Sequence, residues 1–175
     1  TRLDAQGRPT PLIAETGGMN AMIVDSSALT EQVVIDVLAS AFDIAGQRCS
    51  ALRVLCLQEE IADHTLTMLR GAMAECRMGN PGRLTTDIGP VIDAEAKANI
   101  DKHIQAMQAK GRNVFQAMRE NSEDAREWRT GTFVAPTLIE LESFDELQKE
   151  VFGPVLHVVR YSRNQLPQLI EQINA

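Results

Sequence analysis

Apolar residues recur every three or four positions over residues 29–45, a period that predicts an amphipathic helix with one buried face. Ser26 or Ser27 is expected to cap the start of this helix, and Gly46 is expected to end it. The same period returns three more times along the chain. Further helices are therefore predicted at residues 59–77, 94–110 and 163–174.

Short apolar runs between turn residues predict the strands of a sheet. Pro136 interrupts the run at residues 132–141, which predicts an edge or bent strand, because proline cannot donate to a strand ladder. Strands that alternate with helices indicate one layered α/β domain spanning residues 1–175. The other strands are predicted at residues 12–14, 22–24, 52–57, 114–115 and 155–161, with a charged excursion at 119–129.

The composition indicates an ordinary soluble globular domain and argues against a transmembrane segment and against nucleic-acid binding. Hydrophobic residues make up 44% of the chain and charged residues 23%. No apolar run approaches the roughly 20 residues that span a bilayer, so no transmembrane segment is expected. The formal net charge of −7 would repel a phosphate backbone, which argues against nucleic acid as a partner of this segment.

The three cysteines bear on the compartment and on metal binding. Their number is odd, they contain no CxxC pair, and no charged-then-apolar signal segment opens the chain. This argues against a disulfide framework and for a reducing, cytoplasmic compartment. The three histidines form no ligand motif with the cysteines, so no metal site is expected.

Residues 46–50 form a glycine-started loop between a helix and a strand, and the loop carries a thiol at Cys49. A thiol is a strong nucleophile as a thiolate, which the neighbouring Arg48 would favour if its side chain turned toward the sulfur. Backbone amides of the loop could stabilise negative charge on a carbonyl oxygen. The alternative is a thiol that acts as a small hydrophobe, which suits Cys56 in a strand and Cys76 on a helix face.

Two carboxylates stand beside breaks in the regular pattern. Glu15 follows an apolar run and precedes two glycines, while Glu150 lies just before a Phe-Gly-Pro turn. A partly buried carboxylate with a raised pKa could act as a general base toward water. Taken alone, each is better explained as a surface or loop residue. His64, His103 and His157 are interpreted as structural residues of two helices and a strand.

Together, four motifs resemble the aldehyde dehydrogenase superfamily, in the family's order and over nearly the whole chain. The residues around Cys49 and Glu15 are most similar to Δ1-pyrroline-5-carboxylate (glutamate semialdehyde) dehydrogenases, in the form found in bacterial bifunctional proline-utilization flavoenzymes. The motifs are Glu-x-Gly-Gly-x-Asn at residues 15–20, Gly-Gln-x-Cys at 46–49, Gly-x-Phe-x-x-Pro-Thr at 131–137 and Glu-x-Phe-Gly-Pro-Val at 150–155.

The resemblance implies a cysteine mechanism that uses NAD. Cys49 would attack the aldehyde carbon to form a thiohemiacetal, and its backbone N–H would supply half of an oxyanion hole. Hydride would pass to NAD, and Glu15 would activate the water that hydrolyses the resulting thioester. Glu150 would bind the nicotinamide ribose, and Phe152 would pack beside the nicotinamide. Ser50 would help to recognise the amino-acid end of the substrate.

The resemblance also implies a fold and a larger parent protein. The expected fold is the three-layer α/β/α catalytic domain of aldehyde dehydrogenases, without the NAD-binding Rossmann domain and truncated at both ends. The parent is expected to be a homo-oligomer in the cytoplasm or at the periphery of the inner membrane, with FAD only in an upstream proline dehydrogenase module. Because the coenzyme domain and the other half of the oxyanion hole lie outside it, the segment alone is expected to be inactive.

Two other interpretations remain open. The segment could be a scaffold or interaction surface with idle motifs, in which case Cys49 would react with an alkylating agent no faster than Cys56 or Cys76. Alternatively, the family could hold with another substrate, such as succinate semialdehyde. An equal loss of turnover on both aldehydes in a Ser50→Ala variant would remove the reason for choosing glutamate semialdehyde.

Overall fold

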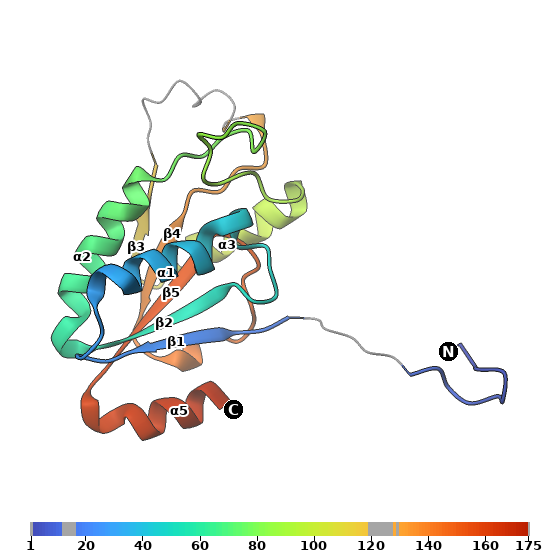
Figure 1. The fold of residues 1–175 in the computed structure, drawn as a ribbon, viewed down its shortest axis with the longest axis horizontal. Helices are drawn as coiled ribbons and strands as arrows, with labels where there is room; N and C mark the ends of the chain where they lie inside the picture. The colour runs from blue at the N-terminus through green and yellow to red at the C-terminus, as the bar shows by residue number, and fades with distance from the viewer. Residues whose placement is uncertain (1, 12–16, 119–127, 129, 175) are drawn as a thin grey trace.

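A five-stranded mixed sheet forms the centre of the computed structural model, which describes residues 2–11, 17–118, 128 and 130–174 (Figure 1). The spatial order of the strands is β1-β2-β5-β4-β3. The first four of these run parallel, and β3 pairs antiparallel with β4. The strands are β1 (Asn20–Val24), β2 (Leu52–Gln58), β3 (Asn113–Gln116), β4 (Thr137–Leu141) and β5 (Val155–Tyr161).

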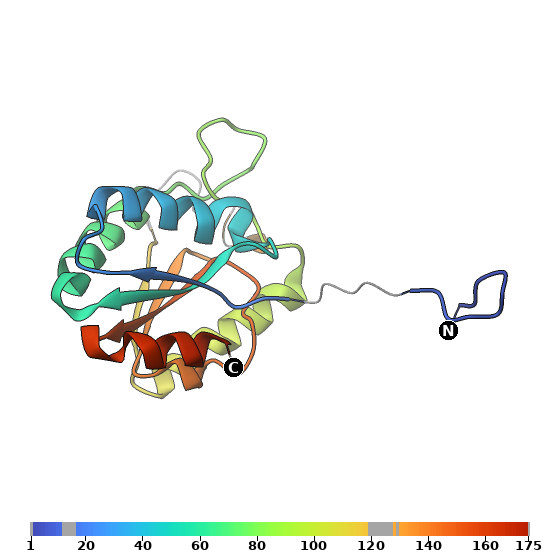
Figure 2. The ribbon, with the colours of Figure 1, turned by 60° about the horizontal axis from the view of Figure 1, so that its bottom comes forward.

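Helices cover both faces of this sheet (Figure 2). On one face α1 (Thr30–Phe42) packs beside α2 (Glu59–Glu75), and on the other lie α3 (Ala94–Ala109) and α5 (Leu166–Asn174). Because each parallel connection has to cross over the sheet, a helix between strands is the expected solution. This confirms the predicted three-layer α/β/α arrangement.

The central strands β2 and β5 hold the core. Every residue of β2 is buried, and β5 exposes only Arg160. A strand of a parallel sheet that is covered by helices on both faces needs such a continuous apolar run. The polar exceptions in β2 are Gln58 at its carboxyl end and Arg53, whose residue surface is only 1% exposed. A buried guanidinium in the middle of the core is the first sign of a specialised site.

The predicted start and end of the first helix are both corrected by the structure. Leu29 is the N-cap residue of α1 and makes no side-chain cap. The Ser27 hydroxyl donates instead to Asp25, and the Ser26 N–H donates to the side chain of Gln58. At the other end α1 stops at Phe42, and a 3₁₀ turn η1 (Asp43–Gly46) follows. The apolar pattern reached Ala45 because that residue is buried, although it is no longer α-helical.

The prediction of an edge or bent strand around Pro136 is wrong. The strand β4 begins only at Thr137 and lies between β5 and β3, inside the sheet. Pro136 precedes the ladder, so its missing N–H costs no strand hydrogen bond, and its carbonyl accepts from the Ala117 N–H. The predicted strand at residues 12–14 and most of the charged excursion at 119–129 lie outside the described residues.

The remaining elements are close to their predicted ranges. The 3₁₀ turns η2 (Phe144–Glu146) and η3 (Arg163–Gln165) precede β5 and α5, respectively. In residues 2–11, Leu3 bridges Pro9 in an antiparallel pair, consistent with the polar, proline-containing sequence there. No helix among the described residues has the length and apolar character needed to cross a bilayer.

Candidate active site

Three motif segments meet at the amino ends of the parallel strands. Residues 17–19 lead into β1, residues 46–51 into β2 and residues 150–154 into β5. Because these three strands are parallel neighbours, the segments that precede them must lie along the same edge of the sheet. Open α/β sheets more commonly bind ligands beyond the carboxyl ends of their strands. Here the chemistry-bearing motifs gather at the opposite end.

The thiol loop packs directly against the backbone of the segment that follows Glu150. Gly46 has a φ of 65°, and a Cβ placed on it would lie 2.3 Å from the carbonyl oxygen of Gly153. It would also lie 2.7 Å from the carbonyl oxygen of Ala41. Only glycine fits this position without strain. The first residue of one motif is therefore in backbone contact with the last glycine of another.

Asn20 holds the thiol loop from the other side. Its side-chain Nδ2 donates to the carbonyl oxygens of Cys49 at 2.7 Å and of Ala51 at 2.9 Å. Cys49 itself is exposed, and none of the three cysteines is in a disulfide. The result is an accessible thiol on a loop whose carbonyls are fixed, which is the arrangement that a nucleophile needs.

Glu150 is bound on both of its carboxylate oxygens. Its Oε1 accepts from Arg53 Nε at 2.9 Å and lies 2.8 Å from Arg53 Nη2. Its Oε2 accepts from the backbone N–H of Gly18 at 3.0 Å. The side chain is 15% exposed. Glu150 thus joins the segment before β1 to the strand β2, while part of its side chain remains exposed.

Arg53 is a site residue that the sequence interpretation missed. Its Nη1 donates to the Gly153 carbonyl and its Nη2 to the Arg48 carbonyl, both at 3.2 Å. Its guanidinium carbon also lies 5.1 Å from the ring centroid of Phe152, a cation–π contact. An arginine inside the apolar run of residues 52–57 was the available signal, since arginine is almost never fully buried without partners.

A cavity of about 520 Å³ opens between α3 and the segment that carries Glu150 and Phe152. Phe152 is 46% exposed at this cavity, an unusual position for a large aromatic residue. The helix α3 was not assigned to the site from sequence. The remaining lining residues are Ala96, Asn99, Ile100, Lys102, His103, Ala106, Lys149 and Val151.

Two histidines form a pair between this cavity and Arg53. The Nε2 atoms of His103 and His157 lie 2.8 Å apart, and His157 Nδ1 lies 3.3 Å from the Arg53 carbonyl oxygen. A carbonyl can only accept, so Nδ1 of His157 carries the proton and its Nε2 accepts from His103. Burial lowers the pKa of His157 to about 3, and burial also lowers the pKa of His103. Both are neutral at pH 7, which agrees with a structural role.

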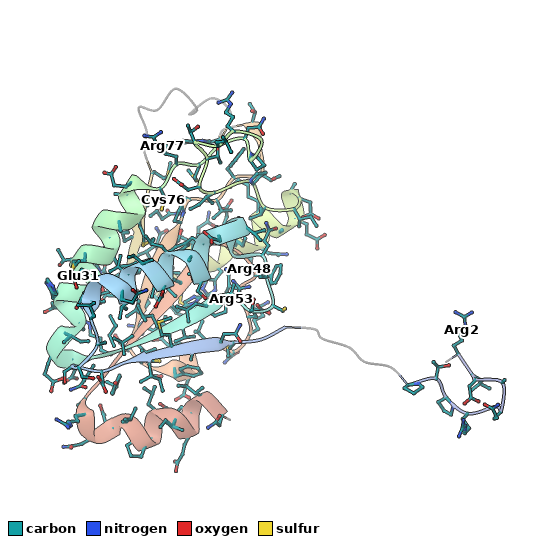
Figure 3. All side chains as sticks on the ribbon, in the orientation of Figure 1. Arg2, Glu31, Arg48, Arg53, Cys76 and Arg77 are labelled. Carbon is teal, nitrogen blue, oxygen red and sulfur yellow. The ribbon has the colours of Figure 1, made fainter. Side chains whose placement is uncertain are left out.

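The structure places the other predicted residues as follows. The guanidinium of Arg48 donates to the Ala39 and Ser40 carbonyls at the C-terminal end of α1, so it stabilises that helix end rather than turning freely toward the thiol (Figure 3). Ser50 is exposed beside Cys49. Glu15 lies outside the described residues, so its proposed role stays a prediction.

The other two cysteines differ clearly from Cys49. Cys56 is buried in β2, and burial raises the pKa of its thiol to about 12. Cys76 is the C-cap residue of α2, half-buried, with its thiol 3.7 Å from the Ala72 carbonyl. Within the described part of the chain, no group of three His, Cys, Asp or Glu residues could hold a metal ion.

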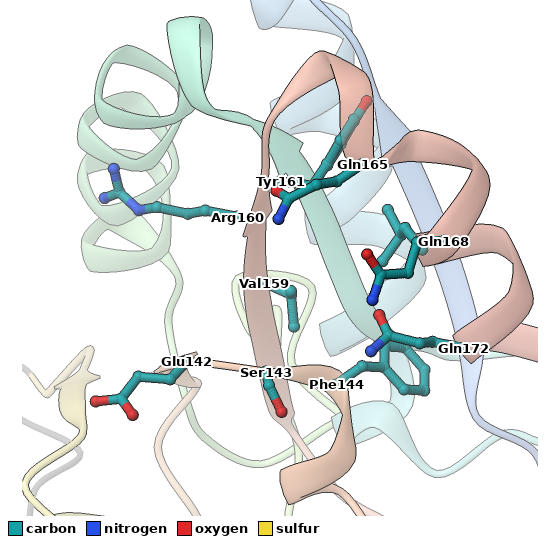
Figure 4. Close-up of a pocket in the computed structure, with 10 residues that line it drawn as sticks. Glu142, Ser143, Phe144, Val159, Arg160, Tyr161, Gln165, Gln168 and Gln172 are labelled. Atoms are coloured by element: carbon teal, nitrogen blue, oxygen red, sulfur yellow. The ribbon is translucent and has the colours of Figure 1, made fainter.

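A second, smaller pocket of about 140 Å³ lies at the other end of the sheet, between β5, η2 and α5 (Figure 4). Its lining is mostly polar and includes Ser143, Gln165, Gln168 and Gln172. None of the motif residues takes part in it.

Curated relatives match all or most of the chain, but the chain covers only a small part of their own length. The bifunctional protein PutA of Escherichia coli (strain K12) is 88% identical over 175 residues, which is 100% of this chain and 13% of that protein. A 1-pyrroline-5-carboxylate dehydrogenase of Bacillus thuringiensis is 31% identical over 147 residues, which is 83% of this chain and 27% of that protein.

Solved structures agree with the sequence matches. A variant of proline utilization A from Bradyrhizobium japonicum superposes with a TM-score of 0.86 and 46% identity, covering 97% of this chain and 17% of that one. A betaine aldehyde dehydrogenase from Staphylococcus aureus in complex with NAD+ gives a TM-score of 0.81 and 29% identity, covering 91% and 32%. Residues 2–175 match the aldehyde dehydrogenase family model, and the chain therefore belongs to that family.

Proposed function

We propose that this chain is the thiol-bearing part of an NAD-dependent L-glutamate γ-semialdehyde dehydrogenase, working as a segment of a larger protein in proline catabolism. The observation that carries the proposal is the meeting of an accessible Cys49 and the cavity-lining Glu150 and Phe152 at one edge of the sheet. Family membership supports the reaction class, and the relatives named PutA and 1-pyrroline-5-carboxylate dehydrogenase support the substrate.

The residues around the larger cavity fit a nicotinamide nucleotide. The half-exposed ring of Phe152 offers an apolar face, and the carboxylate of Glu150 can accept from ribose hydroxyls. Asn99 adds an amide, while Lys102 and Lys149 add positive charge along the same cavity. When bound, NAD+ would supply the hydride acceptor. The likeness to an aldehyde dehydrogenase in complex with NAD+ supports this choice of cofactor.

The chemistry of the chain begins at Cys49. The thiolate sulfur adds to the aldehyde carbon, and the backbone N–H of Cys49 stabilises the negative charge that develops on the aldehyde oxygen. Loss of hydride from that carbon leaves a thioester on the sulfur. Water activated by Glu15 then attacks the thioester carbonyl, which releases the carboxylate product and returns the thiol. In this account Ser50, exposed beside Cys49, contacts the amino-acid end of the substrate.

Replacing Cys49 with Ala or Ser in a full-length protein that carries this segment tests the proposal. NADH formation from glutamate semialdehyde should fall by at least about a thousandfold, because the covalent route is lost. A Glu15→Gln variant should still acylate and should accumulate the thioester, visible as a mass increase on Cys49. Turnover that survives in the Cys49 variants would contradict the proposal. The 175-residue chain alone is expected to give no turnover.

Alkylation can separate the enzyme from an idle scaffold. Burial of Cys56 would slow its alkylation by itself, so a simple ranking of the thiols is not decisive. Protection of Cys49 by the aldehyde substrate is the sharper measurement. A catalytic thiol should be shielded by glutamate semialdehyde, whereas equal rates with and without the aldehyde would favour the scaffold. Comparing glutamate and succinate semialdehyde in a Ser50→Ala variant then addresses the substrate.

A further inference from the structure

We propose that Arg53 is a positioning residue that couples the thiol loop to the cofactor-binding carboxylate, so that one guanidinium orients both halves of the site. This inference rests on the proposed function of Cys49 and Glu150. Two segments supply its partners: Glu150 and the Gly153 carbonyl come from the segment before β5, and the Arg48 carbonyl comes from the thiol loop. Among the described residues, Arg53 is the side chain that hydrogen-bonds to both the thiol loop and the Glu150 segment.

Because Arg53 is buried, its guanidinium must have acceptors within the protein. Its side chain is 2% exposed, and a buried charge is costly unless its hydrogen bonds are met. Here Nε, Nη1 and Nη2 each have an acceptor, with one carboxylate and two backbone carbonyls around the guanidinium plane. Lysine carries a compact charge on a flexible stem and cannot reproduce this planar set of donors. The geometry therefore requires arginine, not only a positive charge.

The bond to the Arg48 carbonyl controls the direction of the Cys49 N–H. The two groups belong to one planar peptide unit, so fixing the C=O also fixes the N–H on the opposite side. The Ala51 N–H donates to the same carbonyl at 3.1 Å, and Asn20 holds the carbonyl of the next peptide. Arg53 thus sets the aim of the donor that faces the developing oxyanion, although it does not touch the substrate itself.

The bond to Glu150 acts on the cofactor side of the site. Arg53 engages Oε1 of the carboxylate through two nitrogens, and Gly18 engages Oε2. The same guanidinium lies against the ring of Phe152. Loss of Arg53 would leave a largely buried carboxylate without its cation and an aromatic ring without its support. Cofactor affinity and oxyanion stabilisation should therefore fall together.

Two measurements in the full-length protein separate these effects. Cleavage of an activated nitrophenyl ester needs the thiol and the oxyanion donors but no cofactor, and calorimetry reports NAD+ binding without turnover. For Arg53→Gln we expect ester cleavage to fall by about 10- to 100-fold, somewhat less than the loss of an oxyanion donor. NAD+ affinity should fall by about tenfold. Arg53→Lys should recover part of the NAD+ affinity and little of the ester cleavage.

The comparison with Glu150 keeps the test informative even if Arg53→Gln folds poorly. The double variant Arg53→Gln/Glu150→Gln leaves no unpaired buried charge, yet it still lacks the bond to the Arg48 carbonyl. Its ester cleavage should stay as low as that of Arg53→Gln, while Glu150→Gln alone should show a smaller loss. Arg112→Gln is the matched control, because Arg112 pairs with Glu142 and Glu146 outside the site.

Different outcomes would contradict the role of Arg53 and the proposed function of Cys49. If the double variant cleaves ester as well as Glu150→Gln, Arg53 does not orient the thiol loop and the inference is wrong. The same holds if Arg53→Gln behaves like Arg112→Gln in both measurements. If instead the unaltered protein shows no Cys49-dependent ester cleavage, the thiol chemistry of the proposed function fails first.

Discussion

The two ends of the sheet both carry charged residues, but they use them differently. At the amino end Arg53 and Glu150 are largely buried and bind across 97 positions of the sequence. At the carboxyl end Arg160 bridges Asp63 and Glu140, and the Asp63 side chain is 89% exposed. Exposed pairs of this kind contribute about 0–1 kcal/mol, whereas breaking a buried pair costs several times more.

The pockets follow the same division. The cavity at the amino end has about 520 Å³ and is lined by α3 and by motif residues from the segment before β5. The pocket at the carboxyl end has about 140 Å³, has a mostly polar lining and contains no motif residue. Buried charge beside a larger cavity is typical of a site under functional constraint. The difference between the two ends lies in the guanidinium: Arg53 is 2% exposed and orients groups around a cavity, whereas Arg160 is 38% exposed and pairs at the surface.

The largest expected effect comes from breaking one ion pair at each end. Glu150→Ala leaves the buried Arg53 without its carboxylate and should lower the free energy of unfolding by about 3–5 kcal/mol. Glu142→Ala removes a carboxylate that is 77% exposed and should cost less than about 1 kcal/mol. Urea unfolding of the 175-residue chain measures both. Equal losses would remove the distinction between the two ends.

A smaller effect is expected from the backbone contact beneath the thiol loop. Gly46→Ala adds a Cβ in the left-handed region and against the Gly153 carbonyl, so it should cost roughly 2–3 kcal/mol. Gly111→Ala is the matched control, since Gly111 has a φ of 77° but nothing within 4 Å of the added Cβ. It should lose only about 1 kcal/mol. Thermal unfolding of both variants would show how much stability is lost to the contact with the Gly153 carbonyl and how much to the positive φ alone. Equal losses would mean that φ alone accounts for the effect.

The pH dependence should show the buried histidine pair. The folded-state pKa of His157 is about 3, below its ordinary value of 6.5, so the unfolded chain takes up the proton first. Stability is then complete above pH 6.5 and decreases as the pH falls toward 3. At pH 5 this contribution should have dropped by about 2 kcal/mol.

Urea unfolding at pH 7 and pH 5 checks this contribution, with two variants for comparison. His157→Gln should lose much of the difference between the two pH values. His64→Gln should retain it, because His64 is exposed on α2. A His157→Gln variant with an undiminished difference would contradict burial as the cause.

Local patterns predicted most of the elements. The strand at residues 155–161 was predicted to the residue, and the helices α2 and α3 end within two residues of their predicted limits. These segments have strong apolar periodicity and clear turn residues at their ends. Where a prediction failed, the position of the segment in the sheet decided the result. Pro136 suggested an edge strand, yet β4 lies inside the sheet because the chain enters the ladder only after the proline.

The sequence by itself determined the order of helices and strands, the family resemblance and the choice of Cys49 and Glu150 as candidates. The tertiary structure decided that Arg53 joins them and that α3 forms one wall of the cavity. It also decided that His103 meets His157. The Arg53–Glu150 and His103–His157 contacts join residues that are 97 and 54 positions apart. They depend on strand order and register, which bring distant segments together and which no local pattern of residues encodes.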